Sequence, residues 1–271
     1  MFTSRTLTLN DGRDMPKLGF GTYKIDDAKA ADTVKLALEE GYALVDTASI
    51  YGNERGVGAA LDGREDIFLT TKVWNSDQGF EQAKVATAAS LGRLGRASVD
   101  LLLIHWPCPG RGRMVDTWKA LIELRDAGHA KSIGVSNFRP QDLEKIVAAT
   151  DVVPVVNQVE CHPAFQQREL RQLHDDMQIV TQSWSPLGRG DLLDHEVISD
   201  VAAALNAPRS AVILAWHLQS GLSAIPKASS RDHIAANMRA EQLTLSDEQI
   251  ERIDAMDDPA GRMGPDPASF C

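Results

Sequence analysis

Short apolar runs alternate with longer segments of helical periodicity along the chain, and this alternation constrains the fold more than any other feature. The apolar runs are residues 18–21, 43–46, 68–72, 101–105, 133–136, 155–160, 179–183 and 223–227, with helical patterns between them. Strands that alternate with helices are typical of a parallel sheet. Eight such units in 271 residues predict an α/β fold in which the sheet closes into a (β/α)8 TIM barrel.

Both ends of the chain carry patterns outside this alternation. Residues 6–9 are β-prone and precede the turn signal Asn10-Asp11-Gly12, so an N-terminal β-hairpin is expected. Ser246 with Gln249 three residues later is a capping box, which predicts that a last helix begins there. Residues 257–271 are rich in Gly, Pro and Asp and are expected to form a loop. We interpret residues 1–271 as one barrel domain.

The charge balance indicates which partners to exclude. The chain has 28 Lys and Arg against 38 Asp and Glu, a formal charge of −10. Such a charge argues against nucleic acid or an anionic membrane surface as partner. No apolar run approaches the roughly 20 residues of a membrane span, and the first residues lack the pattern of a secretory signal. A cytoplasmic monomer that binds a small molecule is therefore expected.

The three cysteines, Cys108, Cys161 and Cys271, form no CxxC motif. So sparse and odd a count fits a reducing compartment and predicts no metal site. Cys161 follows a predicted strand, and we expect it to be buried rather than reactive.

Three consecutive strand-like runs end in a charged or titratable residue: Asp46, Lys72 and His105. Tyr51 follows Asp46 by five residues. Strand ends of a parallel barrel share one face, where catalytic residues gather. A Tyr beside a Lys cation and a His can act as a general acid, because a positive charge lowers a phenol pKa from its reference value of about 10. Asp46 is expected to orient Lys72.

Each of these residues also has an ordinary structural interpretation. A single Asp at a strand end often forms a cap or turn, a single Lys is usually solvated, and a single Tyr usually packs. A barrel lysine can also form a Schiff base, as in aldolases, and Lys72 beside Asp46 is compatible with that chemistry. The joint pattern favours catalysis over the structural interpretations.

Four segments resemble the signature segments of the aldo-keto reductases: GYALVDTASIYGNE (41–54), TTKVW (70–74), LLLIHWP (101–107) and KSIGVSNF (131–138). The resemblance extends over residues 18–257, and IYGNERGVGAA, FQQRE and WSPLGRG are most similar to bacterial diketogluconate reductases of that family. It implies an NAD(P)H-dependent carbonyl reductase on a (β/α)8 barrel. It also implies that Tyr51 is the proton donor and that Asp46, Lys72 and His105 complete a catalytic tetrad.

No G-x-G-x-x-G motif opens a helix after the first predicted strand, so a Rossmann site for the cofactor is not supported. The resemblance implies instead that residues after the strands bind NADPH. Those expected near the nicotinamide and pyrophosphate are Ser136, Asn137, Gln158, Trp184, Ser185 and Leu187. Those expected near the adenosine phosphate are Lys227, Ser229, His233 and Asn237.

Two positions depart from the family pattern. Ala228 stands where Ser is usual, and His233 where Arg is usual. Histidine carries only partial charge near neutral pH and lacks the planar fork of arginine. We therefore expect a weakened preference for NADPH and some use of NADH, with Ser229, Ser230 and Arg231 as candidates to compensate.

The resemblance implies that Tyr23, Trp74 and Trp106 wall the substrate pocket. The loops 107–113 and 189–195 are short, which predicts an open pocket. A keto-sugar acid such as 2,5-diketo-D-gluconate is the expected substrate, and a broad-specificity aldehyde or methylglyoxal reductase is the alternative. Some relatives of this barrel family are channel regulatory subunits; the complete tetrad argues against that role here.

Overall fold

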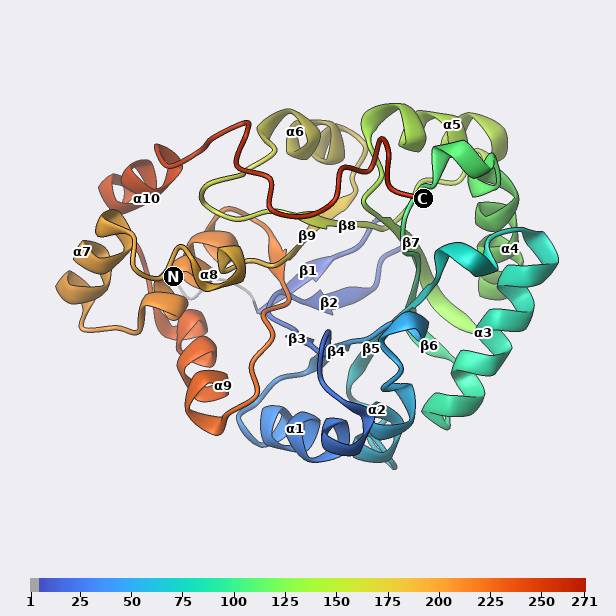
Figure 1. The fold of residues 1–271 in the computed structure, drawn as a ribbon, viewed down its shortest axis with the longest axis horizontal. Coiled ribbons are helices and arrows are strands. Elements are labelled where there is room, and N and C mark those ends of the chain that lie inside the picture. Colours follow the sequence, from blue (N-terminus) through green and yellow to red (C-terminus); the bar gives the residue numbers. More distant parts are fainter. Residues whose placement is uncertain (1–4) are drawn as a thin grey trace.

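The computed structural model describes residues 5–271. Eight parallel strands form one sheet in sequence order, each pairing with the next, and helices surround it (Figure 1). The barrel strands are β3 (Phe20–Gly21), β4 (Leu44–Asp46), β5 (Phe68–Val73), β6 (Val99–Ile104), β7 (Ala130–Ser136), β8 (Val156–Glu160), β9 (Val180–Trp184) and β10 (Ser223–Ala224). The predicted alternation of strands and helices is confirmed.

The sheet closes between its first and last strands. Leu18 and Ala224 form a parallel bridge, and Gly19 N donates to Ala224 O at 2.9 Å. One step further, Gly21 N donates to Pro226 O at 3.0 Å. A Cβ on Gly21 would lie 2.8 Å from Ile225 O, so only glycine allows the two strands to approach this closely.

Helices pack around the barrel, and short 3-10 turns lie at several loops. The α-helices are α1 (Asp27–Glu39), α2 (Glu54–Ala60), α3 (Phe80–Leu94), α4 (Met114–Asp126), α5 (Pro140–Thr150), α6 (Arg168–Asp176), α7 (Glu196–Leu205), α8 (Arg209–Gln219), α9 (Arg231–Met238) and α10 (Asp247–Asp254). The 3-10 turns are η1 (Ser49–Tyr51), η2 (Asn75–Asp77), η3 (Pro109–Arg111), η4 (Gly188–Gly190) and η5 (Arg239–Gln242). The predicted capping box at the start of α10 is confirmed: Ser246 N donates to Gln249 Oε1 at 2.9 Å, and Gln249 N to Ser246 Oγ.

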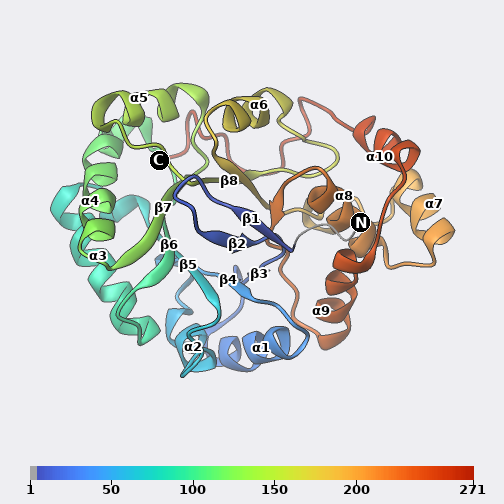
Figure 2. The ribbon, with the colours of Figure 1, turned by 180° about the vertical axis from the view of Figure 1, so that it is seen from behind.

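The N-terminal hairpin closes one end of the barrel. Strands β1 (Thr6–Thr8) and β2 (Asp14–Pro16) pair antiparallel and lie across the opening in Figure 2. Leu9 and Met15 are buried in the same interior cluster as Leu44, Leu101 and other inward-facing strand residues. The predicted hairpin is therefore present, and it leaves the opposite, carboxyl end of the strands for a site.

After α10 the chain crosses that carboxyl end without regular structure (Figure 1). Both oxygens of the Glu160 carboxylate accept backbone N–H groups of this segment, from Met263 at 2.8 Å and Gly264 at 2.9 Å. Residues 257–271, which we call the tail, are thus an ordered loop held against β8.

The cysteine count, interpreted as typical of a reducing compartment, did not predict a disulfide. Cys108 and Cys271 form a disulfide over a sequence separation of 163 residues. The pattern of spacings contained no signal for this pair, because the partners meet only once the tail has crossed the barrel. Cys161 is free and buried, as expected, and burial raises its pKa to about 11, which keeps the thiol protonated and inert.

Among the described residues, no single helix is long and apolar enough to cross a membrane. Helices α7 and α8 meet that length and composition only when taken together, as a pair bent by 93°.

We expect stability to fall as pH drops from about 6.5 to about 4. Asn157 Nδ2 donates to His174 Nε2 at 2.9 Å, so His174 Nδ1 carries the proton and donates to Thr181 Oγ1. Burial lowers the His174 pKa to about 4, whereas the unfolded chain binds the proton near pH 6.5. The difference amounts to about 3 kcal/mol at pH 4. Urea unfolding at pH 7 and 4.5 measures the loss; His174→Gln should reduce it, and an equal loss in both proteins would contradict the assignment.

Candidate functional site

The period of two along each strand places three of the four candidate catalytic residues, Asp46, Lys72 and His105. Leu44 on β4 faces the barrel interior, and Asp46 follows it two residues later. On β5, Phe68 faces the interior, and Lys72 lies an even number of residues later, so it faces the same side. Leu101 and Leu103 on β6 also face the interior, and His105 follows them at the same spacing of two. All three side chains therefore emerge inside the barrel at its carboxyl end.

Lys72 and Asp46 form a buried ion pair. Lys72 Nζ donates to Asp46 Oδ1 at 2.6 Å and to the backbone oxygen of Thr47 at 2.9 Å, and it lies 3.5 Å from the Tyr51 hydroxyl. Both charged side chains are 2% exposed or less. Burial lowers the Lys72 pKa, while Asp46 opposes that shift and supports the charged form. The structure thus brings Asp46, Lys72 and Tyr51 together.

The expectation that the Lys72 charge brings the Tyr51 pKa below 10 is wrong for this structure. Burial raises the Tyr51 pKa well above 10, and the charges of Asp46 and Tyr23 add to the shift. The physical reason is that Asp46 neutralises most of the field of Lys72, which leaves the desolvation of the phenolate as the dominant contribution. Tyr51 therefore keeps its proton across the neutral range.

His105 is a neutral group in this site. Burial lowers its pKa well below 6.5, and the Lys72 charge lowers it further. Its ring lies edge-on to Tyr51 at 5.7 Å and to Trp74 at 4.9 Å between centroids. Within residues 5–271, its buried Nδ1 atom has no hydrogen-bond partner. As a neutral imidazole, His105 can form one hydrogen bond with a ligand, either as donor or as acceptor.

The second oxygen of Asp46 joins the catalytic candidates to Gln158. Gln158 Nε2 donates to Asp46 Oδ2 and to Gln182 Oε1, both at 2.7 Å. Gln182 Nε2 in turn donates to Ser223 Oγ at 3.0 Å, so these hydrogen bonds run in one direction, from Gln158 to Ser223. Because both hydrogens of Gln158 Nε2 are engaged, its Oε1 atom is the part of the amide left for a ligand.

The expected nicotinamide residues form a second network at the ends of β7 and β9. Trp184 Nε1 donates to Asn137 Oδ1 at 2.8 Å, and Asn137 Nδ2 donates to His105 O and Ser136 Oγ, both at 3.0 Å. Asn137 has φ +63° and Ser185 has φ +48°. Left-handed backbone at non-glycine residues stores strain and concentrates at functional sites. Ser185 and Leu187 follow on the same half-exposed segment.

The expected phosphate residues lie at the surface beside α9. Lys227, Ser229 and His233 are exposed, whereas Asn237 is buried and hydrogen-bonded to the Tyr42 hydroxyl. Arg231, a candidate to compensate for the missing arginine, is engaged elsewhere, since it forms ion pairs with Glu39 and Glu40. Ser230 is also engaged, because it caps α9 and accepts from His233 N. Lys227 and His233 remain the cations that this surface offers.

Of the three aromatic residues expected at the substrate pocket, Tyr23 and Trp74 contact rings of the tetrad, and Trp106 contacts Phe270. Tyr23 is 57% exposed with its ring 5.1 Å from that of Tyr51. Phe270 packs on Trp106 at 4.4 Å and on Trp74 at 6.5 Å between ring centroids. Sequence reasoning missed Phe270, because a single Phe in a Gly- and Pro-rich segment carries no periodic signal. The tail therefore brings a further aromatic ring to Trp74 and Trp106.

Sequence reasoning also missed the residues that fix the Tyr51 turn. Asn53 is fully buried; its Nδ2 donates to the backbone oxygens of Thr22 and Ile25, and Thr47 Oγ1 donates to its Oδ1. Glu54 next to it is also buried, and it accepts from Thr71 Oγ1 at 2.6 Å. These contacts join the turn to the loops after β3 and to β5, so the phenol has little freedom to move.

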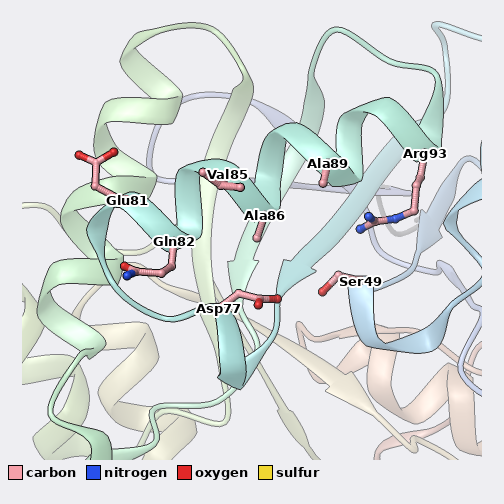
Figure 3. Close-up of a pocket in the computed structure, with 8 residues that line it drawn as sticks. All are labelled: Ser49, Asp77, Glu81, Gln82, Val85, Ala86, Ala89 and Arg93. Carbon is pink, nitrogen blue, oxygen red and sulfur yellow. The ribbon is translucent and has the colours of Figure 1, made fainter.

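A surface groove outside the barrel contains none of the tetrad. It has a volume of about 510 Å³ and lies between η1 and α3 (Figure 3). Its lining residues are Ser49, Asp77, Glu81, Gln82, Val85, Ala86, Ala89 and Arg93. Arg93 in its wall is paired with Glu54. The groove thus lies behind the Tyr51 turn, outside the barrel, and size alone does not identify the site of chemistry.

A closed parallel barrel with polar side chains gathered at its carboxyl face defines the protein as a barrel enzyme. Residues 17–258 match the Aldo/keto reductase family. An aldo-keto reductase of Mycolicibacterium smegmatis is 43% identical over 271 residues, which cover 98% of each chain. A crystal structure of a Gox0644 mutant in complex with NADPH has a TM-score of 0.97 at 44% identity, covering 98% of both chains. An aldo/keto reductase from Brucella melitensis has a TM-score of 0.90 at 45% identity, covering 93% of this chain and 99% of that one.

This chain belongs to the aldo/keto reductase family and is an oxidoreductase of that class.

Proposed function

We propose that the protein reduces aldehydes and ketones to alcohols with NADPH, and that Tyr51 donates the proton. The observation that carries the proposal is the Tyr51 hydroxyl 3.5 Å from a buried Lys72 ammonium group, which Asp46 holds at 2.6 Å. The NADPH complex of the similar Gox0644 mutant supports the choice of cofactor.

The donor set of the carboxyl face fits such a cofactor. Gln158 Oε1 suits a carboxamide NH2 group as an acceptor, and the Ser136 hydroxyl, which donates to the Gln158 backbone oxygen, lies on the neighbouring strand. The half-exposed Trp184 ring suits stacking on a planar heterocycle. Lys227 and His233, with the Ser229 hydroxyl, suit a phosphate at the surface. In the proposal Ser185 and Leu187 contact the pyrophosphate, and Asn237 binds the adenine.

In the proposed reaction, bound NADPH supplies the hydride that the carbonyl carbon accepts. Tyr51 holds its proton at the phenol oxygen, since burial keeps its pKa high, and releases it when the carbonyl oxygen gains alkoxide character. Lys72 stabilises the phenolate that remains, and Asp46 keeps Lys72 in place. Neutral His105 orients the carbonyl oxygen through one ring nitrogen.

We propose a keto-sugar acid such as 2,5-diketo-D-gluconate as substrate, with Tyr23, Trp74 and Trp106 as the walls that contact its CH faces. Phe270 joins these walls in the structure, and a more apolar pocket favours the alternative, a broad-specificity aldehyde or methylglyoxal reductase. We also propose that residues 1–271 act as one domain in a cytoplasmic monomer. The acidic charge of −10 supports that proposal.

NADPH absorbance at fixed enzyme concentration tests the function. Turnover with 2,5-diketo-D-gluconate at a kcat/KM above that for methylglyoxal supports the keto-sugar acid, and the reverse order supports the alternative. An aldolase would cleave or join its substrate without NADPH, and a regulatory subunit would bind NADPH with little turnover. Either result would overturn the proposal.

We expect NADPH to be preferred but NADH to support measurable turnover. Charge-assisted hydrogen bonds to a phosphate contribute roughly 1.5–3 kcal/mol each, so an arginine in place of His233 should tighten NADPH by about tenfold and NADH much less. KM for both cofactors, in wild type and His233→Arg, measures these effects.

His129→Arg is the matched control for this experiment. His129 is exposed and directly precedes β7. The His129→Arg substitution therefore makes the same change of side chain at the amino end of the barrel. The ratio of the two KM values should stay at the wild-type value in this variant. Equal ratios in wild type and His233→Arg would remove His233 from the phosphate site.

A further inference from the structure

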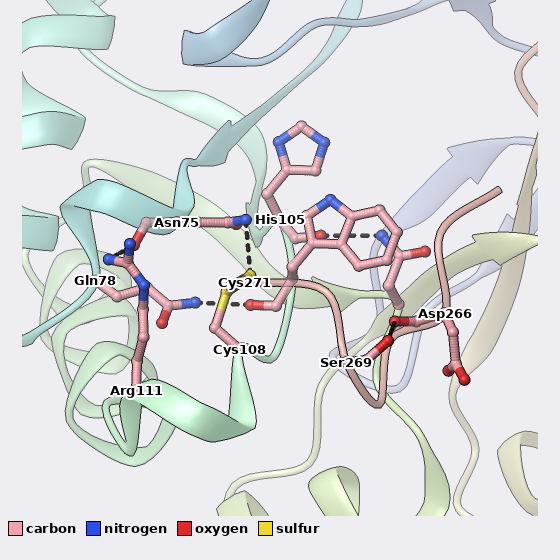
Figure 4. The surroundings of a disulfide bond; sticks show 10 residues. Asn75, Gln78, His105, Cys108, Arg111, Asp266, Ser269 and Cys271 are labelled. Atoms are coloured by element: carbon pink, nitrogen blue, oxygen red, sulfur yellow. Dashed lines mark hydrogen bonds between the residues drawn. A yellow bond between two sulfur atoms is a disulfide. The ribbon is translucent and has the colours of Figure 1, made fainter.

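The Cys108–Cys271 disulfide joins the tail to the loop that follows β6. Cys108 is fully buried and lies three residues after His105, whereas Cys271 is exposed. Asn75 from the loop after β5 donates to Cys271 Sγ at 2.9 Å, and Arg111 from η3 donates to the backbone oxygen of Asn75, also at 2.9 Å (Figure 4). The cross-link therefore lies where the loops after β5 and β6 and the tail meet.

Phe270 is the residue whose position the disulfide controls most directly. It immediately precedes Cys271, and its ring packs 4.4 Å from Trp106 and 6.5 Å from Trp74 between centroids. Trp74 in turn lies 4.9 Å from His105. A continuous series of aromatic contacts thus extends from the disulfide to the catalytic face.

Apart from the disulfide, the buried Pro267 and the ring contacts of Phe270 hold this end of the tail, and few hydrogen bonds attach it to the barrel. Glu160 holds Met263 and Gly264, but beyond them the hydrogen bonds described within residues 5–271 stay inside the tail, apart from the one from Asn75. Ser269 N and Phe270 N both donate to Asp266 O, which shapes the turn without attaching it to the barrel. If the disulfide opened, the Phe270 ring would keep only its stacking contacts.

We propose that the Cys108–Cys271 disulfide is a reversible thiol–disulfide switch that sets substrate selectivity by fixing Phe270 as a wall of the pocket. The proposal rests on the carbonyl-reductase function proposed above. In the oxidised protein Phe270 narrows the pocket beside Trp106 and favours small carbonyl compounds. In the reduced protein the ring leaves the wall, so small substrates lose a contact and bulkier ones gain room.

The switching chemistry balances with a dithiol as reductant. One thiolate of the dithiol attacks the sulfur of Cys271, the exposed residue of the pair, the bond between Cys108 and Cys271 breaks, and the Cys108 thiolate leaves and takes up a proton. The second thiol of the reductant then displaces Cys271 from the mixed disulfide. The dithiol becomes a disulfide, and the protein gains two electrons and two protons. A thioredoxin-class protein or dithiothreitol provides this reactant.

The test compares oxidised and dithiothreitol-reduced enzyme with a small aldehyde, methylglyoxal, and a bulkier one, benzaldehyde. Aromatic contacts of this kind correspond to roughly three- to tenfold in binding. Reduction should therefore lower kcat/KM for methylglyoxal by about that factor and raise the benzaldehyde-to-methylglyoxal ratio, with KM for NADPH unchanged. Thiol titration of the denatured protein should give one free cysteine before reduction and three after it.

Three variants separate the switch from other effects. Cys271→Ser and Phe270→Ala should both show the selectivity of the reduced enzyme and should no longer respond to dithiothreitol. Cys161→Ala removes the free buried thiol and should respond like wild type. Hydrogen exchange of residues 265–271 should rise on reduction and in Cys271→Ser, which gives a readout that does not depend on turnover.

Selectivity that stays constant while the thiol count rises from one to three would overturn the switch. A count of three before reduction would overturn it as well, since no disulfide would then be present. Absence of NADPH oxidation with every carbonyl compound would instead contradict the proposed function, and the exchange of residues 265–271 would still show whether the disulfide holds the tail.

Discussion

Tyr51→Phe is expected to lower kcat by at least about 10²-fold and to leave the affinity for NADPH near the wild-type value. The phenol proton is the group that neutralises the forming alkoxide, and general acid catalysis contributes typically 10²–10⁴-fold. The ring itself only packs against its neighbours, Tyr23 and His105, and phenylalanine preserves those contacts. Steady-state kinetics with one aldehyde, together with NADPH binding by fluorescence titration, measures both effects.

Tyr23→Phe is the matched control for this substitution. It removes the same hydroxyl from a ring 5.1 Å away, but that side chain is 57% exposed and has no described contact with Lys72. Its kcat should stay within a fewfold of wild type. A Tyr51→Phe enzyme that retained most of its kcat, or one no worse than Tyr23→Phe, would remove Tyr51 from the role of proton donor.

Lys72→Met is expected to reduce activity by about a hundredfold or more and to destabilise the fold. Breaking a buried ion pair costs about 3–5 kcal/mol, because the remaining charge stays buried without its partner. Asp46 is that remaining charge, and the Gln158 amide is the one side chain among residues 5–271 that would still donate to its carboxylate. We also expect the pH at which Tyr51 titrates to rise, since the phenolate would lose its nearest cation. The pH profile of NADPH oxidation and urea unfolding measure the two effects.

Lys131→Met provides the control for the loss of a barrel lysine. Lys131 on β7 pairs with Asp100 at 2.8 Å, but it is about half exposed, and exposed pairs contribute little. Its stability and activity should remain close to wild type. A Lys72→Met enzyme with the wild-type pH profile would show that the lysine and the phenol are not coupled.

The sequence predicted those parts of the structure that depend on local patterns. The parity of β4 and β5, read from Leu44 to Asp46 and from Phe68 to Lys72, decides which side chains face inwards. Since each candidate ends its strand, a closed barrel brings them to one face regardless of the intervening helices. The capping box at Ser246 is equally local.

Features that depend on the whole fold could not be predicted in this way. The direction of the Tyr51 pKa shift follows from its burial by several loops and from the neutralisation of Lys72 by Asp46. The contact of Phe270 with Trp106 joins segments more than 160 residues apart, as the disulfide does. The burial of Glu54 could not be predicted either, because an isolated acidic residue at a helix start is usually solvated.

The carboxylate of Asp46 connects the two halves of the barrel, because each of its oxygens binds a side chain from a different half. Oδ1 binds Lys72 from β5, and Oδ2 binds Gln158 from β8, on the far side of the ring of strands. A carboxylate engaged at both oxygens cannot rotate to favour one partner without weakening the other. Redesign of this family member for another cofactor through β8 would therefore also shift the lysine that supports Tyr51, so the two functions cannot be tuned separately at this position.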